Sequence, residues 1–243
     1  NQSMHLKRVR LLAERYPTRD HYPYTLPLLR ENTGFDFDTP VTFLVGDNGS
    51  GKTTLLEALA TACGIHIWRN ELTARVHANH YESSFADHLA VEWTTGRVPG
   101  SFFSAQYHKD FSRFLEEWAA TDPGQLRYFG GGSLLERSHG ESVMSLLRSS
   151  YSRPGLYLAD EPETALSPKR QLELVRLLAE CAREGKAQFV IATHSPILLA
   201  CPGATLYGLD EAPARRIDYE ETQYFRLFRD FLNDRQAFLR DPD

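Results

Sequence analysis

The sequence predicts an α/β fold in which helices cover a mostly parallel central sheet. A short apolar run at residues 41–46 ends in a glycine-rich turn, and a stretch rich in Leu and Ala follows at 53–63. Two more apolar runs, in 155–162 and 187–196, each end in polar residues, and a helix-like stretch at 167–185 separates them. Strands that alternate with helices in this way form a mostly parallel sheet.

The remaining segments are expected to complete the same domain. No Pro- or Gly-rich linker divides the chain, so we predict one domain over residues 1–243. The sequences "IHIWRNEL" and "HLAVEWTTG" are typical of antiparallel strands, and "ATLYGLDE" of one more strand of the main sheet. The predicted subdivisions are an antiparallel lobe at about 65–108, a helical insertion at about 109–152 and a C-terminal helix at about 220–243.

Composition limits the classes of protein that the chain can represent. It is 42% hydrophobic and 24% charged, as in an ordinary globular protein, and no apolar run approaches the ~18 residues that span a membrane. The N-terminus "NQSMHLKRVR" lacks the apolar core of a signal peptide, and three cysteines without metal-like spacing favour a reducing compartment. We therefore expect a cytoplasmic protein with no membrane insertion of its own. The net charge of −5 argues against a generic nucleic-acid binder, although a local basic face is compatible with it.

The turn after the first apolar run fits a phosphate-binding loop. Its sequence is "GDNGSGKT", Gly46 to Thr53, between a predicted strand and a predicted helix. Glycines let the backbone turn its N–H groups towards phosphate oxygens, Lys52 would reach the β- and γ-phosphates, and the Thr53 hydroxyl would bind Mg²⁺. The predicted nucleotide contacts are Asn48, Gly49, Ser50, Gly51, Lys52, Thr53 and Thr54.

Two later strands end in residues suited to phosphate chemistry. Asp160 stands at the carboxyl end of the apolar run in "GLYLADEPE", where open α/β sheets bind ligands, and could hold Mg²⁺. Glu161 could polarise the water that attacks a γ-phosphate. The alternative, a solvated acidic turn, is disfavoured by the phosphate loop in the same chain. His194, in "VIATHSP", ends a third strand and is assigned to the same site, although a lone histidine is more often structural.

Two further candidates have an open alternative. Ser138, Gly140 and Glu141, in "RSHGESVMSLL", precede a helix whose N-terminus could bind an anion, and the same residues fit a simple capping motif. The phosphate loop already cradles the phosphates, so a second anion site makes sense if it meets a nucleotide held by another copy. Gln106, in "FFSAQYH", could reach Mg²⁺ or water, or could be an ordinary polar loop residue.

Taken together, these motifs resemble the ATP-binding-cassette (ABC) class of ATPases, in particular the non-transporter heads akin to SMC and OLD-type proteins. The phosphate loop, the glutamine, "SHGES", "LADEPE" and "THS" occur in that family's order between about Val41 and Leu209. "SHGES" is similar to the family's "LSGGQ" signature with histidine at the first glycine. "ETALSP" is similar to the D-loop, with Ser167 where the family often has aspartate.

The resemblance implies a composite site in which two copies enclose two ATP molecules. Lys52 of one copy and Ser138 of the other would hold the same γ-phosphate. By the same resemblance, Glu161 would be the catalytic base, and Asp160 and Thr53 would be the magnesium ligands. Gln106 would be the sensor, with a catalytic role and a contact to Mg²⁺, and His194 would be the switch. ATP would then act as the contact between the copies, so that binding closes the dimer and hydrolysis opens it.

Two classes of function follow from this resemblance. The first is a stand-alone ATPase that serves a nucleic-acid or antiphage task through a partner such as a nuclease or another effector. The alternative is the ATP-binding subunit of an ABC transporter, which predicts a cleft for a permease helix after Gln106 and a well-formed signature. A non-hydrolysing scaffold is disfavoured by Glu161. Tyr22 and Tyr24 are expected to pack under the N-terminal strands rather than against adenine.

Overall fold

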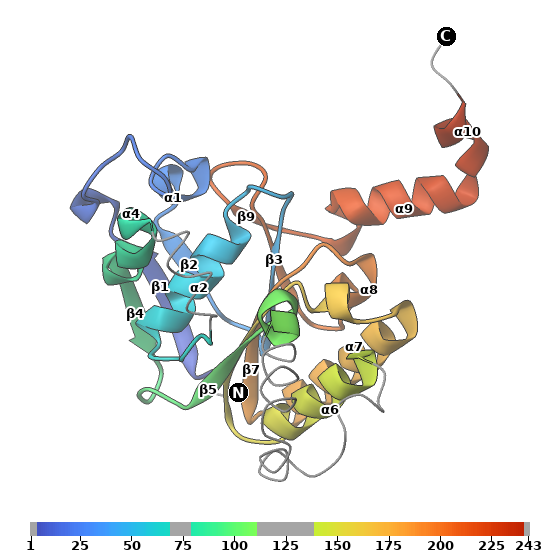
Figure 1. The fold of residues 1–243 in the computed structure, drawn as a ribbon, viewed down its shortest axis with the longest axis horizontal. Coiled ribbons are helices and arrows are strands. Elements are labelled where there is room, and N and C mark those ends of the chain that lie inside the picture. Colours follow the sequence, from blue (N-terminus) through green and yellow to red (C-terminus); the bar gives the residue numbers. More distant parts are fainter. Residues whose placement is uncertain (1–3, 69–78, 111–138, 241–243) are drawn as a thin grey trace, which may run out of the picture.

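A computed structural model describes residues 4–68, 79–110 and 139–240 (Figure 1). Its principal strands are β1 (Leu6–Leu11), β2 (Gly34–Asp36), β3 (Val41–Val45), β4 (Leu89–Trp93), β5 (Gly100–Ser104), β6 (Gly155–Asp160), β7 (Ala187–Ala192), β8 (Thr205–Gly208) and β9 (Arg215–Ile217). Its α-helices are α1 (Pro27–Glu31), α2 (Lys52–Ala62), α4 (His80–Ser84), α6 (His139–Tyr151), α7 (Pro168–Glu184), α8 (Pro196–Leu199), α9 (Gln223–Asn233) and α10 (Arg235–Leu239).

The larger sheet has the strand order β5-β6-β7-β3-β8-β9. Its first five strands run parallel, and β9 pairs antiparallel with β8 at the edge. All five residues of β3 and all six of β7 are buried, as expected for parallel strands covered on both faces. The predicted fold class, a mostly parallel sheet accompanied by a small antiparallel one, is confirmed.

The smaller sheet has the order β2-β1-β4 and is antiparallel. The sequence prediction placed the antiparallel lobe at about 65–108, but within the described residues only β4 comes from that range. Residues 65–68 lie in no strand, and 69–78 are outside the described residues. β5 joins the larger sheet instead, because its five residues pair in parallel register with Leu156 to Asp160. The sequence analysis expected N-terminal strands but assigned β1 no residue range, because its sequence LKRVRL has charged residues at three of six positions.

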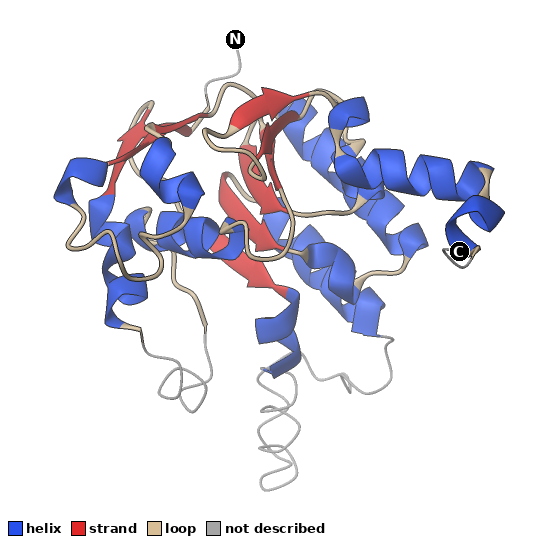
Figure 2. Cartoon of the chain, turned by 90° about the horizontal axis from the view of Figure 1, so that it is seen from above, coloured by secondary structure: helices blue, strands red, loops and turns tan. Residues whose placement is uncertain are grey.

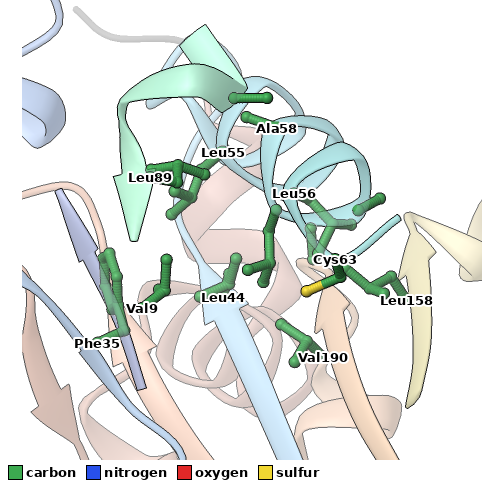
Figure 3. Packing of buried hydrophobic residues seen from close by; sticks show 14 of the residues in the cluster. Val9, Phe35, Leu44, Leu55, Leu56, Ala58, Cys63, Leu89, Leu158 and Val190 are labelled. Carbon is green, nitrogen blue, oxygen red and sulfur yellow. The ribbon is translucent and has the colours of Figure 1, made fainter. Parts of the chain in front are cut away.

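The larger sheet separates two hydrophobic clusters. On one face, Leu44 and Val190 pack with Leu55 and Leu56 of α2, and this cluster continues under the antiparallel sheet (Figure 3). On the other face, the neighbouring strand residues pack against α6 and α7. Because side chains alternate along a strand, β3 contributes residues to both clusters. The helices α2 and α6, which pack on different clusters, therefore lie on opposite faces of the sheet.

The C-terminal segment leaves the body of the molecule. Figures 1 and 2 show α9 and α10 extending to one side of the sheet and helix layers. The predicted helix at about 220–243 is thus two helices over its described part, with Asp234 between them. A helical insertion was predicted at about 109–152. Residues 111–138 of that range are outside the described residues, and the thirteen residues of α6 form most of the part that follows. Among the described residues, no helix is both long enough and apolar enough to cross a membrane.

Candidate nucleotide-binding site

Four loops meet at the carboxyl edge of the parallel sheet. The loops follow four strands that are successive neighbours in the sheet, in the order β6-β7-β3-β8. Parallel strands deliver their carboxyl ends to one edge, so residues that are more than 100 positions apart converge there. The candidate site therefore contains the loop 46–51, Asp160 with Glu161, His194, and Asp210.

The loop after β3 has the backbone that its glycines predict. Gly49 and Gly51 have φ values of +87° and +96°, which side chains other than glycine rarely allow. Gly51 caps α2, and a Cβ at Gly46 would lie 2.7 Å from the Ser50 hydroxyl oxygen. Lys52 is buried, and its Nζ donates to the carbonyl oxygens of Gly46 and of Asp47, the latter at 3.0 Å. The loop thus encloses its own lysine.

The predicted contacts on this loop differ in exposure. Asn48 and Gly49 lie exposed at its tip, whereas Thr54 is buried in the first turn of α2. The Thr54 hydroxyl forms a hydrogen bond with the hydroxyl of Tyr22. Tyr22 is half-exposed, while Tyr24 is fully buried in the core, as expected. The expectation that both tyrosines pack under the N-terminal strands therefore holds for Tyr24. Tyr22 instead contacts Thr54 in the first turn of α2.

Thr53 and Asp160 form a pair across the site. The Thr53 hydroxyl donates to Oδ2 of Asp160 at 3.0 Å. The other oxygen, Oδ1, is buried and has no hydrogen-bond partner among the described residues. Burial raises the pKa of Asp160 to about 6; the Thr53 hydrogen bond opposes this shift, and the nearby Glu161 adds to it. A hydroxyl beside a partly unsatisfied carboxylate is a ligand pair that Mg²⁺ accepts in phosphate sites.

Glu161 lies between Lys52 and His194. Its Oε1 is 4.0 Å from Lys52 Nζ and 3.3 Å from Nδ1 of His194. Among the described residues other than glycine, Glu161 alone has a positive φ, +45°. Its backbone N–H donates to Ala192 O of β7 at 2.8 Å, which holds this conformation. Backbone strain of this kind is concentrated at functional sites, where the surrounding structure over-determines the conformation.

Glu163 is a residue of the site that the sequence analysis treated only as part of the D-loop stretch. Its Oε1 accepts the backbone N–H of His194 at 3.0 Å and lies 3.5 Å from His194 Nδ1. The side chain is 7% exposed, and its Oε2 has no partner among the described residues. Burial raises the pKa of Glu163, against hydrogen bonds from His194 and Thr193. The signal for it was the third acidic residue of "DEPE", two positions after Glu161.

Gln106 lies beyond β5, in a helical stretch at residues 105–110. β5 ends at Ser104, which pairs with Asp160, so the chain around Gln106 starts at the edge of the site. The exposed Gln106 side chain donates to the carboxylate of Asp110 at 3.2 and 3.3 Å. In this arrangement its amide is engaged by its own helix rather than by Asp160.

Two of the predicted signature residues, Gly140 and Glu141, lie on the other face of the sheet from the phosphate loop. Ser138 is outside the described residues. Gly140 and Glu141 are in the first turn of α6, and a Cβ at Gly140 would lie 3.4 Å from Ala165 O. Glu141 lines a small polar pocket with Met144, Ser145, Arg148 and Arg170. Since α6 and α2 cover opposite faces, Gly140 and Glu141 are not brought together with Lys52 within one copy.

The fold and this loop place the chain among the P-loop NTPases. Among the described residues, no group of three or more His, Cys, Asp and Glu side chains is arranged to hold a metal ion. Mg²⁺ is usually bound through one or two protein oxygens together with substrate phosphates, and the Thr53–Asp160 pair could supply such oxygens.

Comparisons with known proteins identify the family. Two models of AAA domains match, one over residues 24–97 and one, described as "AAA domain, putative AbiEii toxin, Type IV TA system", over 124–200. The cytochrome c biogenesis ATP-binding export protein CcmA of Paramagnetospirillum magneticum is 31% identical, over 69% of this chain and 80% of that protein. The chain belongs to the ATP-binding-cassette ATPases.

Other relatives extend the comparison. The hemin import ATP-binding protein HmuV of Rhodopseudomonas palustris is 30% identical, over 61% of this chain. The match spans 63% of HmuV, which is less than two thirds of its length. A crystal structure of an SMC head bound to the C-terminal winged-helix domain of ScpA matches 88% of this chain and 98% of that one, with a TM-score of 0.50 and 12% identity. That likeness concerns the fold.

Proposed function

We propose that this chain binds ATP with Mg²⁺ at the carboxyl edge of the sheet and hydrolyses it. The observation that carries the proposal is the convergence of Lys52, the Thr53–Asp160 pair, and Glu161 with His194. These groups match the needs of phosphoryl transfer, which depends on positioning and on charge stabilisation around the γ-phosphate. The phosphate loop would hold the polyphosphate through residues 48–54.

Each side chain of the site has a proposed task. Lys52 leaves the carbonyls of its own loop and neutralises the β- and γ-phosphate oxygens. Glu161 accepts a proton from the attacking water, and His194, which Glu163 holds by its backbone N–H, orients that water. Thr53 and Asp160 would hold Mg²⁺, which supplies charge neutralisation when bound. The unpartnered Asp160 Oδ1 supports this assignment. Gln106 would have to exchange its contact with Asp110 to take part.

We further propose that the complete site needs two copies. Gly140 and Glu141, two of the three expected signature contacts, belong to the helix layer opposite α2. A second copy turned to face the first would present its α6 N-terminus to the phosphates held by Lys52. Helix N-termini favour anions, so this arrangement would place ATP between the copies.

The process that hydrolysis serves is proposed as a DNA-related or defence task in the cytoplasm, carried out with a nuclease or another effector. The description of the family model over 124–200, which names a toxin of a type IV toxin–antitoxin system, supports a defence role.

The alternative is the ATP-binding subunit of a transporter, and two observations favour it. The relatives are named as ATP-binding proteins of import and export systems. A hollow of about 210 Å³ lies beside β5 and α6, close to Gln106, where a transporter subunit is expected to receive its permease. Its lining is mostly aromatic and apolar: Trp68, Phe102, Phe103, Ser104, Tyr107, His108 and Leu146.

The substitution Glu161→Gln tests the central proposal. We expect it to lower the ATPase rate by at least about 100-fold, because the general base is lost, and to leave ATP binding intact. With ATP and Mg²⁺ the variant should elute as a dimer in size-exclusion chromatography. Glu184→Gln, at the exposed end of α7, removes a carboxylate far from the site and should behave as wild type. A Glu161→Gln variant that binds ATP but stays monomeric would exclude the two-copy site, and one with wild-type activity would exclude Glu161 as the base.

A further inference from the structure

The C-terminal helix begins at the nucleotide site. Tyr224, in the first turn of α9, donates its hydroxyl hydrogen to Oδ1 of Asp47 at 2.6 Å. Its ring centroid is 5.3 Å from that of His194. A side chain of the C-terminal segment therefore contacts two loops of the site, the phosphate loop and the loop after β7.

The start of α9 is fixed to the body by contacts on both sides of Tyr224. The Tyr219 hydroxyl donates to Pro196 O at 2.8 Å, and the Tyr219 ring packs on Phe225 at 4.7 Å. Thr222 is buried; its hydroxyl donates to Tyr219 O at 2.7 Å and accepts the N–H of Phe225. The position of Tyr224 is therefore set by the fold and not by the motion of a free chain end.

The rest of α9 has little attachment. Every residue from 226 to 233 is exposed, although several are apolar, and the helix continues away from the sheet (Figures 1 and 2). A helix that is attached mainly at its first turn changes direction when that turn moves. The protection of its amides from hydrogen exchange likewise depends on the stability of that turn. The contact between Tyr224 and the site is thus in a position to control the orientation of the whole helix.

Asp47 is the residue through which Tyr224 meets the phosphate loop. Its backbone N–H donates to Asp210 Oδ1 at 2.7 Å, and its carbonyl accepts Lys52 Nζ at 3.0 Å. When Lys52 turns to a phosphate, that carbonyl loses its partner. The hydrogen bond that Asp47 donates to Asp210 and the one that it accepts from Tyr224 remain to hold the loop. Burial and the hydrogen bond to Asp47 raise the pKa of Tyr224, so its hydroxyl stays a donor.

We propose that Tyr224 is a positioning residue of the nucleotide site, which holds Asp47 for phosphate binding and links the orientation of α9 to ATP occupancy. The inference rests on the proposed function, because the ligand concerned is the polyphosphate of ATP. Tyr224 acts through Asp47 and His194 and does not touch the reacting atoms. Bound ATP would add contacts to the loop, and through Asp47 and Tyr224 it would further stabilise the first turn of α9, which is already attached to the body.

Kinetics separate this role from a structural one. Tyr224→Phe removes the hydroxyl and keeps the ring against His194, so we expect KM for ATP to rise about threefold or more while kcat stays within about twofold. Tyr224→Ala also removes the ring and should lower kcat. The control, Tyr157→Phe, removes a hydroxyl that donates to Arg153 O at 2.7 Å, before the start of β6, and should leave KM and kcat unchanged.

Hydrogen exchange measures the link to α9 directly. With Mg²⁺ and an ATP analogue that resists hydrolysis, amides in residues 223–233 should exchange more slowly in the wild type, and Tyr224→Phe should not gain this protection. Calorimetry of analogue binding distinguishes the two levels of failure. If the wild type binds no analogue, the proposed function fails. If it binds and hydrolyses ATP, but α9 exchange is unchanged or Tyr224→Phe keeps the wild-type KM, the role of Tyr224 is overturned and the ATPase assignment stands.

Discussion

Single buried oxygen atoms define the candidate site most sharply. Five buried side-chain polar atoms have no hydrogen-bond partner among the described residues, and three of them belong to Ser50, Asp160 and Glu163 at this edge of the sheet. Folded proteins satisfy nearly all of their buried polar groups, so unpaired atoms gathered at one place indicate where a ligand supplies the partners. The stability of the site and its function are therefore in conflict at these residues.

Asp160→Asn exposes this conflict. Burial raises the pKa of Asp160 to about 6, so the folded state prefers the protonated carboxyl. The stabilisation that protonation gives is present below the ordinary pKa and is lost as the pH rises through about 6. At pH 8, with a chelator and no nucleotide, we expect Asp160→Asn to raise Tm by roughly 2–4 °C, and at pH 5 the gain should shrink.

Thermal scans with Mg²⁺ and ATP complete this experiment. The wild type should gain stability from the ligands, and Asp160→Asn should gain little. Asp87→Asn, an exposed aspartate in a short helical turn, is the control and should not change Tm at either pH. A variant that is less stable than the wild type at pH 8 would contradict this account of Asp160.

At the scale of elements, Gln188 is one of the side chains that join the two sheets, as is Tyr207 of β8, whose hydroxyl donates to Asp36 O of β2 at 2.9 Å. Gln188 of β7 is 1% exposed, and its amide accepts the N–H of Leu6 at 2.8 Å and donates to Leu6 O at 2.9 Å. The Gln188 side chain therefore pairs with both backbone groups of Leu6, as a neighbouring strand would, and holds the start of β1 against the parallel sheet. This contact lies near the amino ends of β1 and β7, whereas the phosphate loop follows the carboxyl end of β3, so Gln188 stabilises the fold away from the candidate site.

Gln188→Leu should destabilise the protein by about 2–4 kcal/mol, because it leaves both backbone groups of Leu6 buried and unpaired. Urea denaturation measures this free energy. Gln236→Leu, in the exposed α10, is the matched control and should change it by less than about 0.5 kcal/mol. Equal stability of the two variants would mean that the Gln188 hydrogen bonds contribute little to joining the sheets.

For the whole molecule, charge and layering bear on the partner. The chain has a net charge of −5, so any DNA contact must use a local basic face. Lys7 and Arg8 lie exposed on β1, yet each is paired, with Glu92 at 2.9 Å and with Asp36. The layering, with α2 and α6 on opposite faces, favours a partner that is itself a second copy.

Measuring the ATPase rate with double-stranded DNA separates the two functional classes. For the DNA-related function we expect the rate to rise at least about twofold at low salt and to return towards its basal value near 0.3 M salt, since phosphate contacts release counterions. Heparin at the same charge concentration is the control for a general polyanion effect and should not stimulate. A rate that is indifferent to every nucleic acid would favour the transporter alternative.

How far the sequence could predict the molecule depends on the distance between contacting residues. The cap residues of α7, Ser167 and Gly185, were predictable because capping is local: Ser167 accepts the N–H of Arg170, and Gly185 has a φ of +71°. The strands β3, β6 and β7 were predictable because burial on both faces makes them continuously apolar. The range of β1 was not, because Lys7 and Arg8 are both exposed and break the alternation of buried and exposed residues that identifies a strand.

By itself, the sequence determined the local chemistry: a glycine loop that encloses Lys52, an acidic strand end at Asp160, and a histidine at the end of another strand. These follow from backbone preferences and from short spacings along the chain. Only the tertiary structure decided that Glu163 holds His194, that Gln188 joins two sheets, and that Tyr224 reaches Asp47 from 177 positions away. Such contacts depend on strand order and helix placement, which no short stretch of sequence contains.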